Sequence, residues 1–229
     1  MNLKKTKKQK HWCNAFTLAE VLITLSIIGI VAAMTLPTLI QNYKKKAYAT
    51  RAHKAYAELL QAIKLSEIDN GPIQDWNCVT SAQGSIDCVE KYIKPYYKDL
   101  AFCPERATVC GHGIGANDAR YKIPSGVCLS FQYNSNNLYL VMDVNLAQLP
   151  NLMGIDAFYF NTANSKNMLL PYGFDANPTR EQILQGYNYG NYLTSCKKSA
   201  TEENEQNRHG CTLLLYLDNW EIKDDYPWQ

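Results

Sequence analysis

The chain has 229 residues, of which 46% are hydrophobic and 11% aromatic, a composition that excludes a largely disordered protein. Its formal net charge of +2 at pH 7 is too small to mark the whole chain as a nucleic-acid binder, so charge matters only where it is clustered. The length allows one domain, or a modest domain with a long appendage.

A short lysine-rich segment, residues 1–15, leads into a long apolar stretch, residues 16–40. Glu20 is the only charged side chain of that stretch, and roughly 20 apolar residues suffice for a helix to cross a membrane. An ordinary secretory signal has a shorter apolar core, followed by a small-residue cleavage site. The stretch therefore predicts a membrane-spanning helix and not a standard removable signal.

Lysines lie on both sides of the apolar stretch, so charge counting leaves the orientation of the helix open. The cysteines favour one answer, because Cys13 precedes the stretch and the other seven of the eight follow it. Disulfides persist in oxidising compartments such as a periplasm or a cell surface. We therefore expect the amino terminus inside the cell and the remainder outside.

The run "AFTLAEVLITLSIIGIVAAMTLP" resembles the type III signal of prepilin-like proteins, the type IV pilins and type II secretion pseudopilins. The resemblance implies cleavage by a prepilin peptidase between Ala15 and Phe16, followed by N-methylation of Phe16. It also makes Glu20 the fifth residue of the mature chain, where the family has a glutamate, and it places Gly29 and Pro37 where members often have glycine and proline. Ala15 departs from the usual glycine before the cut, so cleavage is expected to be slower.

Glu20 needs a reason to remain in an apolar helix. Charges inside membranes are usually paired and functional. Once the leader is removed, Phe16 carries a positive amino group, and a neighbouring subunit shifted along a filament could bring that group against Glu20. We hypothesise that Glu20 aligns subunits during assembly; the alternative is a tolerated carboxylate that reaches the lipid headgroups.

Residues 41–70 predict an amphipathic continuation of the same helix, which ends at "DNGP". Gly29 and Pro37 are expected to bend or loosen the helix, since proline removes a backbone donor. Within residues 41–70, the apolar positions have helical spacing, and the charged positions fall on the opposite side. The apolar positions are Tyr48, Ala52, Ala55, Tyr56, Leu59, Ala62 and Ile63.

Residues 71–229 predict a globular domain with short strands. Two stretches rich in β-formers, 126–133 and 138–145, read as a hairpin, and 156–161 is a plausible third strand. The stretch 211–217 is compatible with a strand or a short helix. A small antiparallel sheet packed on the long helix gives an α+β fold, which matches the pilin-like architecture that the leader implies.

Cysteine spacing suggests local disulfides. A Cys196–Cys211 bond would close a charged loop, and it resembles the carboxy-terminal disulfide-bounded loop of many pilins. Neighbouring positions suggest the pairs Cys78–Cys88 and Cys103–Cys110, which leaves Cys128 unassigned, although sequence alone does not fix the connectivity. A metal site at Cys103, Cys110 and His112 is less favoured than a disulfide, because their spacing is not that of a metal-binding pair.

Asp143, Asn145 and Asp156 are weak calcium candidates. Their oxygens suit calcium, and the segment resembles a stretch found in many bacterial pilin-like proteins. The alternative is turn capping by Asp and Asn side chains. Otherwise we expect no cofactor and no enzyme activity, since the globular region offers two histidines and neither a G-x-S-x-G elbow nor an H-E-x-x-H pair.

The sequence thus predicts a structural subunit of a type IV pilus or a type II secretion pseudopilus. It would reside in the bacterial inner membrane with its carboxy-terminal domain outside, and then in a filament. Its expected partners are a prepilin peptidase, other pilin or pseudopilin subunits and an inner-membrane assembly platform, and no direct contact with nucleic acid is expected. The alternative is a single-span anchored binding domain that does not polymerise. Secretion, adhesion, motility and DNA uptake stay undecided.

Overall fold

The computed structural model describes residues 16–104, 110–190, 192–197 and 208–228. The leader, including Ala15, lies outside the described residues. Contacts divide the chain into two compact units that meet between Tyr43 and Lys44. The long helix α1 (Leu18–Asn70) contributes to both units, and Pro37 lies inside it.

The second half of α1 buries one face in the globular unit. Six of the seven apolar positions expected from the sequence are buried there, with Tyr48 packed at the margin. The helix ends as "DNGP" predicts: Gly71 has a φ of 79°, its N–H bonds to the carbonyl of Glu67 at 3.1 Å, and Pro72 follows. A left-handed residue after the last turn is a common helix stop, and glycine adopts it without strain.

The main sheet is an antiparallel meander, in which the strands are ordered as they follow in the chain. Its strands are β1 (Ala101–Phe102), β2 (Ala119–Ile123), β3 (Val127–Asn134), β4 (Asn137–Asp143), β5 (Ala157–Asn161) and β6 (Leu170–Pro171). The expected hairpin is β3–β4, and the expected third strand is β5. Ser135 and Asn136 form the two-residue turn, both with positive φ, as right-twisted hairpins favour.

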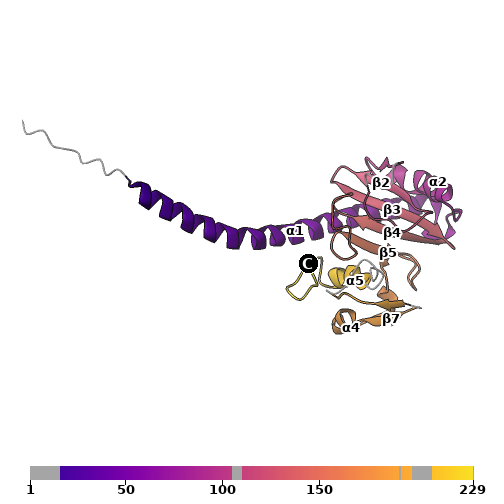
Figure 1. Ribbon diagram of the computed structural model, residues 1–229. Coiled ribbons are helices and arrows are strands. Elements are labelled where there is room, and N and C mark those ends of the chain that lie inside the picture. The colour runs from indigo at the N-terminus through magenta and orange to yellow at the C-terminus, as the bar shows by residue number, and fades with distance from the viewer. Residues whose placement is uncertain (1–15, 105–109, 191, 198–207, 229) are drawn as a thin grey trace, which may run out of the picture. The chain divides into compact units, whose positions relative to one another are not determined.

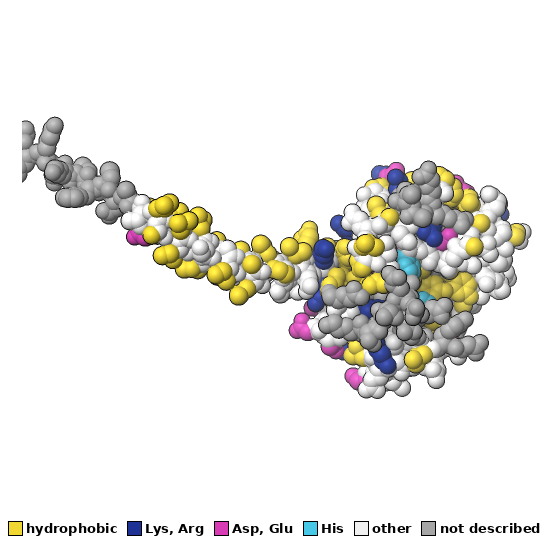
Figure 2. Space-filling model, in the orientation of Figure 1, with side chains coloured by type: hydrophobic (Ala, Val, Ile, Leu, Met, Phe, Trp, Pro, Cys, Tyr) yellow, Lys and Arg dark blue, Asp and Glu magenta, His cyan; other side chains and the backbone are white. Residues whose placement is uncertain are grey.

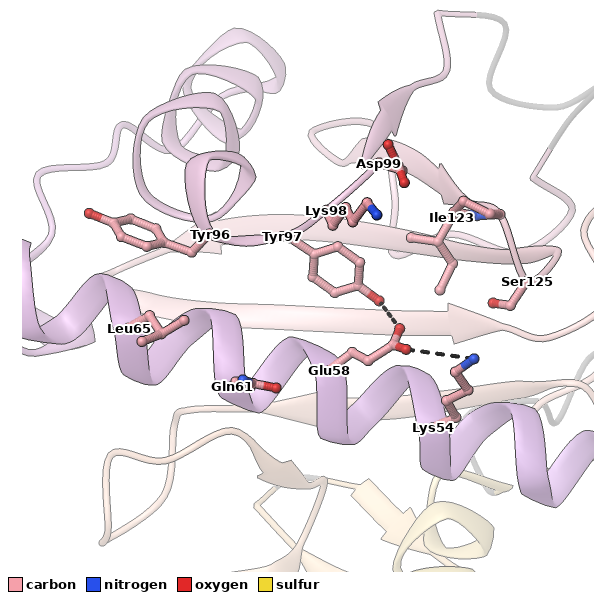
Figure 3. Close-up of a pocket in the computed structure, with 11 residues that line it drawn as sticks. Lys54, Glu58, Gln61, Leu65, Tyr96, Tyr97, Lys98, Asp99, Ile123 and Ser125 are labelled. Atoms are coloured by element: carbon pink, nitrogen blue, oxygen red, sulfur yellow. Dashed lines mark hydrogen bonds and ion pairs between the residues drawn. The ribbon is translucent and has the colours of Figure 1, made fainter.

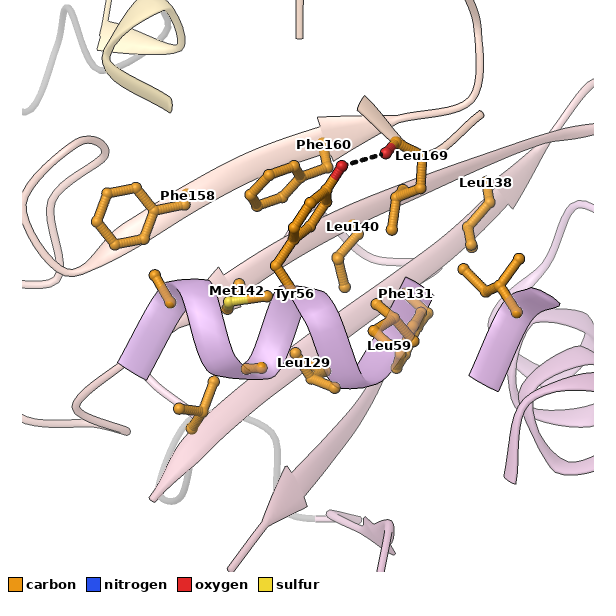
Figure 4. Packing of buried hydrophobic residues seen from close by; sticks show 14 of the residues in the cluster. Tyr56, Leu59, Leu129, Phe131, Leu138, Leu140, Met142, Phe158, Phe160 and Leu169 are labelled. Atoms are coloured by element: carbon orange, nitrogen blue, oxygen red, sulfur yellow. Dashed lines mark hydrogen bonds between the residues drawn. The ribbon is translucent and has the colours of Figure 1, made fainter. Parts of the chain in front are cut away.

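One face of this sheet packs on α1 and makes the core (Figure 4). Alternate residues of β3, β4 and β5 point to that face, among them Phe131, Leu140 and Phe160. Tyr56 of α1 stacks on Phe160 at 4.9 Å between ring centroids and donates its hydroxyl to the carbonyl of Leu169 at 2.8 Å. The α+β, pilin-like arrangement expected from the sequence is therefore the one observed.

Smaller elements flank the two edges of the sheet (Figure 1). Helix α2 (Ala82–Tyr92) contacts β2 and β3, while α5 (Gly210–Leu217) contacts β5, β6 and α4 (Arg180–Gln185). The stretch 211–217, which the sequence left open, is thus helical. A separate hairpin consists of β7 (Tyr187–Tyr189) and β8 (Tyr192–Thr194), and short 3₁₀ turns span Ile73–Asp75, Lys94–Tyr96 and Phe174–Ala176.

Three disulfides join Cys78 to Cys88, Cys110 to Cys128 and Cys196 to Cys211. The first and third are the expected pairs, but the Cys103–Cys110 pair is wrong, because Cys110 bonds to Cys128 on β3 and Cys103 is a buried free thiol. Tertiary hydrogen bonds explain the difference. Arg120 on β2 donates to the carbonyl of Cys110 at 2.8 Å and brings that segment to the sheet.

The carboxy-terminal segment docks on the core through its aromatic residues. Tyr226 is buried and donates its hydroxyl to the carbonyl of Gly154 at 2.6 Å, while Trp220 and Trp228 pack at the core margin. Arg208 is also buried, and its guanidinium donates to the carbonyls of Met153 and Pro227 at 2.8 and 3.0 Å. These bonds supply the polar partners that a buried charge requires.

Candidate functional site

Helix α1 begins with a reciprocal pair of hydrogen bonds between Thr17 and Glu20. The Thr17 backbone N–H and hydroxyl both donate to Oε2 of Glu20, at 2.8 and 2.7 Å, and the Glu20 N–H donates to the Thr17 hydroxyl at 3.2 Å. This arrangement is a capping box, which satisfies amide groups that the first helical turn leaves unpaired. Thr17 was not among the expected site residues, although the pattern Thr-x-x-Glu is the signal for such a cap.

The first half of α1 exposes its apolar side chains, and Figure 2 shows those on one face of the helix. Phe16 is 85% exposed and Leu18 77%, and even Val21 keeps 41% of its surface accessible. By length and composition this helix could cross a membrane, with a mean hydropathy of 2.2 over its most apolar window. Isolated soluble domains do not leave so much contiguous apolar surface uncovered, so the segment needs lipid or protein around it.

Gly29 and Pro37 lie within this exposed segment. A Cβ atom at Gly29 would meet no other atom within 4 Å in the described chain, and Pro37 interrupts the backbone hydrogen bonding of the helix interior. Neither residue is therefore explained by packing within the described part of the chain. Their proposed role in bending the helix stays a prediction.

Asp143, Asn145 and Asp156 lie together where β4 leaves the sheet and the chain returns as β5. Asp156 accepts hydrogen bonds from the N–H groups of Asn151 and Leu152, at 2.9 and 2.6 Å, and from the Asn145 side chain at 2.9 Å. Asp143 accepts from the N–H groups of Asn145 and His112, at 3.1 and 3.0 Å. Every carboxylate oxygen thus faces an N–H donor, the arrangement of turn-capping side chains.

Burial dominates the electrostatics of this loop. It raises the pKa of Asp143 to about 7 and also raises that of Asp156, while the backbone donors oppose the shift. Asn145 Oδ1 is buried without a hydrogen-bond partner in the described part of the chain. Among the described residues, no group of three or more His, Cys, Asp or Glu side chains is placed to hold a metal ion.

A groove of about 390 Å³ separates α1 from the turns beside β2 (Figure 3). Two of its charged side chains are paired: Lys54 lies 3.8 Å from the Glu58 carboxylate, which also accepts a hydrogen bond from the Tyr97 hydroxyl at 2.9 Å. Burial and the neighbouring Glu58 raise the pKa of Tyr97, so its hydroxyl stays a donor.

Comparison with known families assigns both parts of the chain. A family model described as a family of unknown function, DUF6613, matches residues 38–229. The chain belongs to the DUF6613 family. A second model, the prokaryotic N-terminal methylation motif, matches residues 13–36 of this DUF6613 protein.

The methylation motif confirms the prepilin-type signal that the sequence predicted. It implies processing by a prepilin peptidase, and together with the apolar helix it is consistent with a membrane-anchored extracytoplasmic protein. The boundary between the two matched regions falls at Pro37. No curated protein and no solved structure matches the DUF6613 chain significantly.

Proposed function

We propose that the chain is a structural subunit of a type IV pilus or a type II secretion pseudopilus, processed by a prepilin peptidase and polymerised through the first half of α1. Its work is packing and surface display, not catalysis. The observation that carries the proposal is the apolar helix exposed on all sides directly behind a methylation motif. A plain anchor needs the apolar length but not the motif.

Polymerisation gives the exposed helix a protein environment once it leaves the lipid. In a bundle of such helices the apolar side chains cover one another, so the segment suits both the membrane and a filament core. Extraction by an inner-membrane assembly platform would connect the two environments. The disulfide-bonded globular unit would then form the outer surface.

The test follows processing and assembly separately, in a host that carries the assembly genes. Mass spectrometry of the amino terminus should find N-methylated Phe16 in the sheared filament fraction. A photo-crosslinking residue at Ile27, which is 57% exposed, should capture a second copy or another subunit, whereas one at Val79, 66% exposed on the globular unit, serves as the control for random collision.

The competing function is an anchored extracytoplasmic domain that never polymerises. It predicts that Ile27 captures only lipid and that the chain stays in the detergent-soluble membrane fraction. An amino terminus that retains Met1 and the lysines of the leader would contradict processing itself. Cleavage without crosslinking would instead contradict the filament alone.

A further inference from the structure

A second groove, of about 580 Å³, lies over the face of the main sheet that points away from α1. Its floor comes from the side chains of β3, β4 and β5, and its walls come from the segments around Tyr172 and Tyr189. Grooves of this volume hold small molecules or segments of larger ones. The lining residues are Ile114, Gln132, Asn134, Tyr139, Tyr159, Asn161, Ala163, Tyr172, Tyr189 and Gly190.

The strand register places three polar side chains in one row across the floor. Gln132 of β3 is directly opposite Tyr139 of β4, and Tyr139 is directly opposite Asn161 of β5. Their chain neighbours, such as Phe131 and Phe160, point to the core on the other face. The Cβ atoms of directly opposed residues lie about 5 Å apart, so the row presents three hydrogen-bonding groups at regular spacing.

None of the three side chains has a hydrogen-bond partner in the described part of the chain. Asn161 is the most buried of the three, because only 2% of its surface is exposed, and it lines the groove. A polar group that reaches an accessible groove without a protein partner usually binds water or a ligand. Gln132 and Tyr139 are half-buried beside it and extend the same unpaired row.

Tyrosine rings make up the wall beside this row. Tyr159 stacks between Tyr139 and Tyr172, with ring centroids 6.5 and 5.1 Å away, and Tyr189 meets Tyr172 edge-on at 4.9 Å. Burial raises the pKa of Tyr139 and of Tyr159, so both hydroxyls are neutral. Among the residues that the structure describes, the lining contains no Lys, Arg, Asp or Glu.

This chemistry selects the ligand class. An anion would find no cation among these lining residues. A quaternary ammonium group would use the tyrosine rings but leave the row of Gln132, Tyr139 and Asn161 without hydrogen-bond partners. Amides both donate and accept, which matches hydroxyl groups that do the same, while tyrosine offers apolar surface to the C–H groups of a sugar ring. A neutral, polyhydroxylated chain satisfies both parts of the groove.

We propose that this groove binds a neutral oligosaccharide, with the side chains of Gln132, Tyr139 and Asn161 hydrogen-bonded to sugar hydroxyls. The site is independent of filament formation, since every lining residue belongs to the globular unit. On a filament it would provide a glycan-binding face. On a plain anchor it would do the same at the membrane.

The test measures binding of three uncharged probes, maltohexaose, cellohexaose and chitohexaose, to the full chain in phospholipid nanodiscs by isothermal titration calorimetry. At least one probe should bind with a Kd of about 1 mM or tighter, a weak affinity on the usual scale. A sulfated heparin hexasaccharide should bind more weakly. Failure of all three neutral probes, or preference for the sulfated one, overturns the proposal.

Variants locate the binding. Gln132→Ala and Asn161→Leu should each raise the Kd at least about tenfold, the effect of losing one good hydrogen-bonding partner. The matched control is Tyr96→Phe. Tyr96 lines the other groove, beside α1, and this variant removes only its hydroxyl, which donates a hydrogen bond to Asp69, so the Kd should be unchanged. Gln132 is half-buried, so its variant keeps the test decisive even where Asn161→Leu lowers folding yield. Unchanged binding in both groove variants places the sugar elsewhere and refutes the site.

Discussion

Thr17 and Glu20 hold each other at the start of α1: both Thr17 donors bind one carboxylate oxygen of Glu20, and the Glu20 N–H binds the Thr17 hydroxyl. The carboxylate therefore has a role within its own chain besides the proposed pairing with a neighbour's amino group. The two roles can be separated by substitution. Glutamine keeps an oxygen for the cap but has no charge, whereas Thr17→Val removes the hydroxyl and keeps the charge.

If pairing with a neighbour is the dominant role, Glu20→Gln and Glu20→Ala should both lower incorporation into filaments by about tenfold or more, as for the loss of about 1.4 kcal/mol of interaction. Thr17→Val should lower it less, because this variant keeps the charge of Glu20 and loses only a cap worth about 1 kcal/mol within one chain. Quantitative immunoblots of sheared filaments measure the effect, and amino-terminal mass spectrometry checks that each variant is cleaved. Wild-type incorporation of Glu20→Gln would leave capping as the function of this carboxylate.

Asp156 should be a stability determinant and not a calcium ligand. Asp156→Ala removes the acceptor for the Asn151 and Leu152 N–H groups and for the Asn145 amide, so we expect a loss of about 3 kcal/mol in the free energy of unfolding. The exposed Asp75→Ala should change it by less than about 0.5 kcal/mol. Denaturant titration measures both.

The same loop predicts no thermal shift on adding calcium. Each oxygen of Asp143 and Asp156 already faces an N–H donor, and a cation would have to displace those donors. Melting curves with calcium and with a chelator should therefore coincide. A rise of several degrees with calcium would show instead that the loop rearranges to use these oxygens as ligands.

The elements that depend on residues close together in the chain could be predicted from the sequence. The stop of α1 follows from Gly71 and Pro72, and the buried face from the spacing of Ala52, Tyr56 and Leu59. Helix α2 was missed because Gly84 lowers its helix propensity, yet the glycine is required: a Cβ there would lie 2.1 Å from the carbonyl oxygen of Val79. The Ser81 hydroxyl, which caps the helix by accepting from Gly84, was the available signal.

Features that depend on tertiary register could not be predicted in this way. The Cys110–Cys128 bond depends on where β3 lies relative to the loop before β2, and sequence distance favoured Cys103 instead. The row of Gln132, Tyr139 and Asn161 likewise exists only once three strands have paired. A shift of one residue in either pairing would send these side chains to the opposite face.

Cys103 should be a free but unreactive thiol. It is 3% exposed, and burial raises its pKa, which lowers the fraction of reactive thiolate. Iodoacetamide should not label the processed, folded chain, whereas unfolding without reductant should reveal one thiol. Cys128→Ala should cost about 3 kcal/mol through loss of the disulfide, and Cys103→Ala about 1 kcal/mol. Recovery of a Cys103–Cys110 peptide after digestion would contradict the assignment.

His209 should make the chain less stable in mild acid. Burial lowers its pKa from 6.5 to about 4, with His112 as a second, smaller cause, and its ring packs 4.7 Å from Tyr159 and 5.3 Å from Tyr172. The unfolded chain then binds a proton more readily than the folded chain between these pH values. The stabilising contribution is therefore complete above pH 6.5 and is lost as the pH falls towards 4.

His209→Phe keeps an aromatic ring and removes the titration. Between pH 7 and pH 4.5, the unfolding free energy of the wild type should fall by about 2 kcal/mol more than that of this variant. This value is reduced for the partial exposure of the ring. Carboxylates such as Asp143 titrate in both proteins, so the difference between the two curves isolates the imidazole. A parallel curve for His209→Phe would mean that the imidazole is protonated inside the fold, and that the tyrosines around it tolerate a charge.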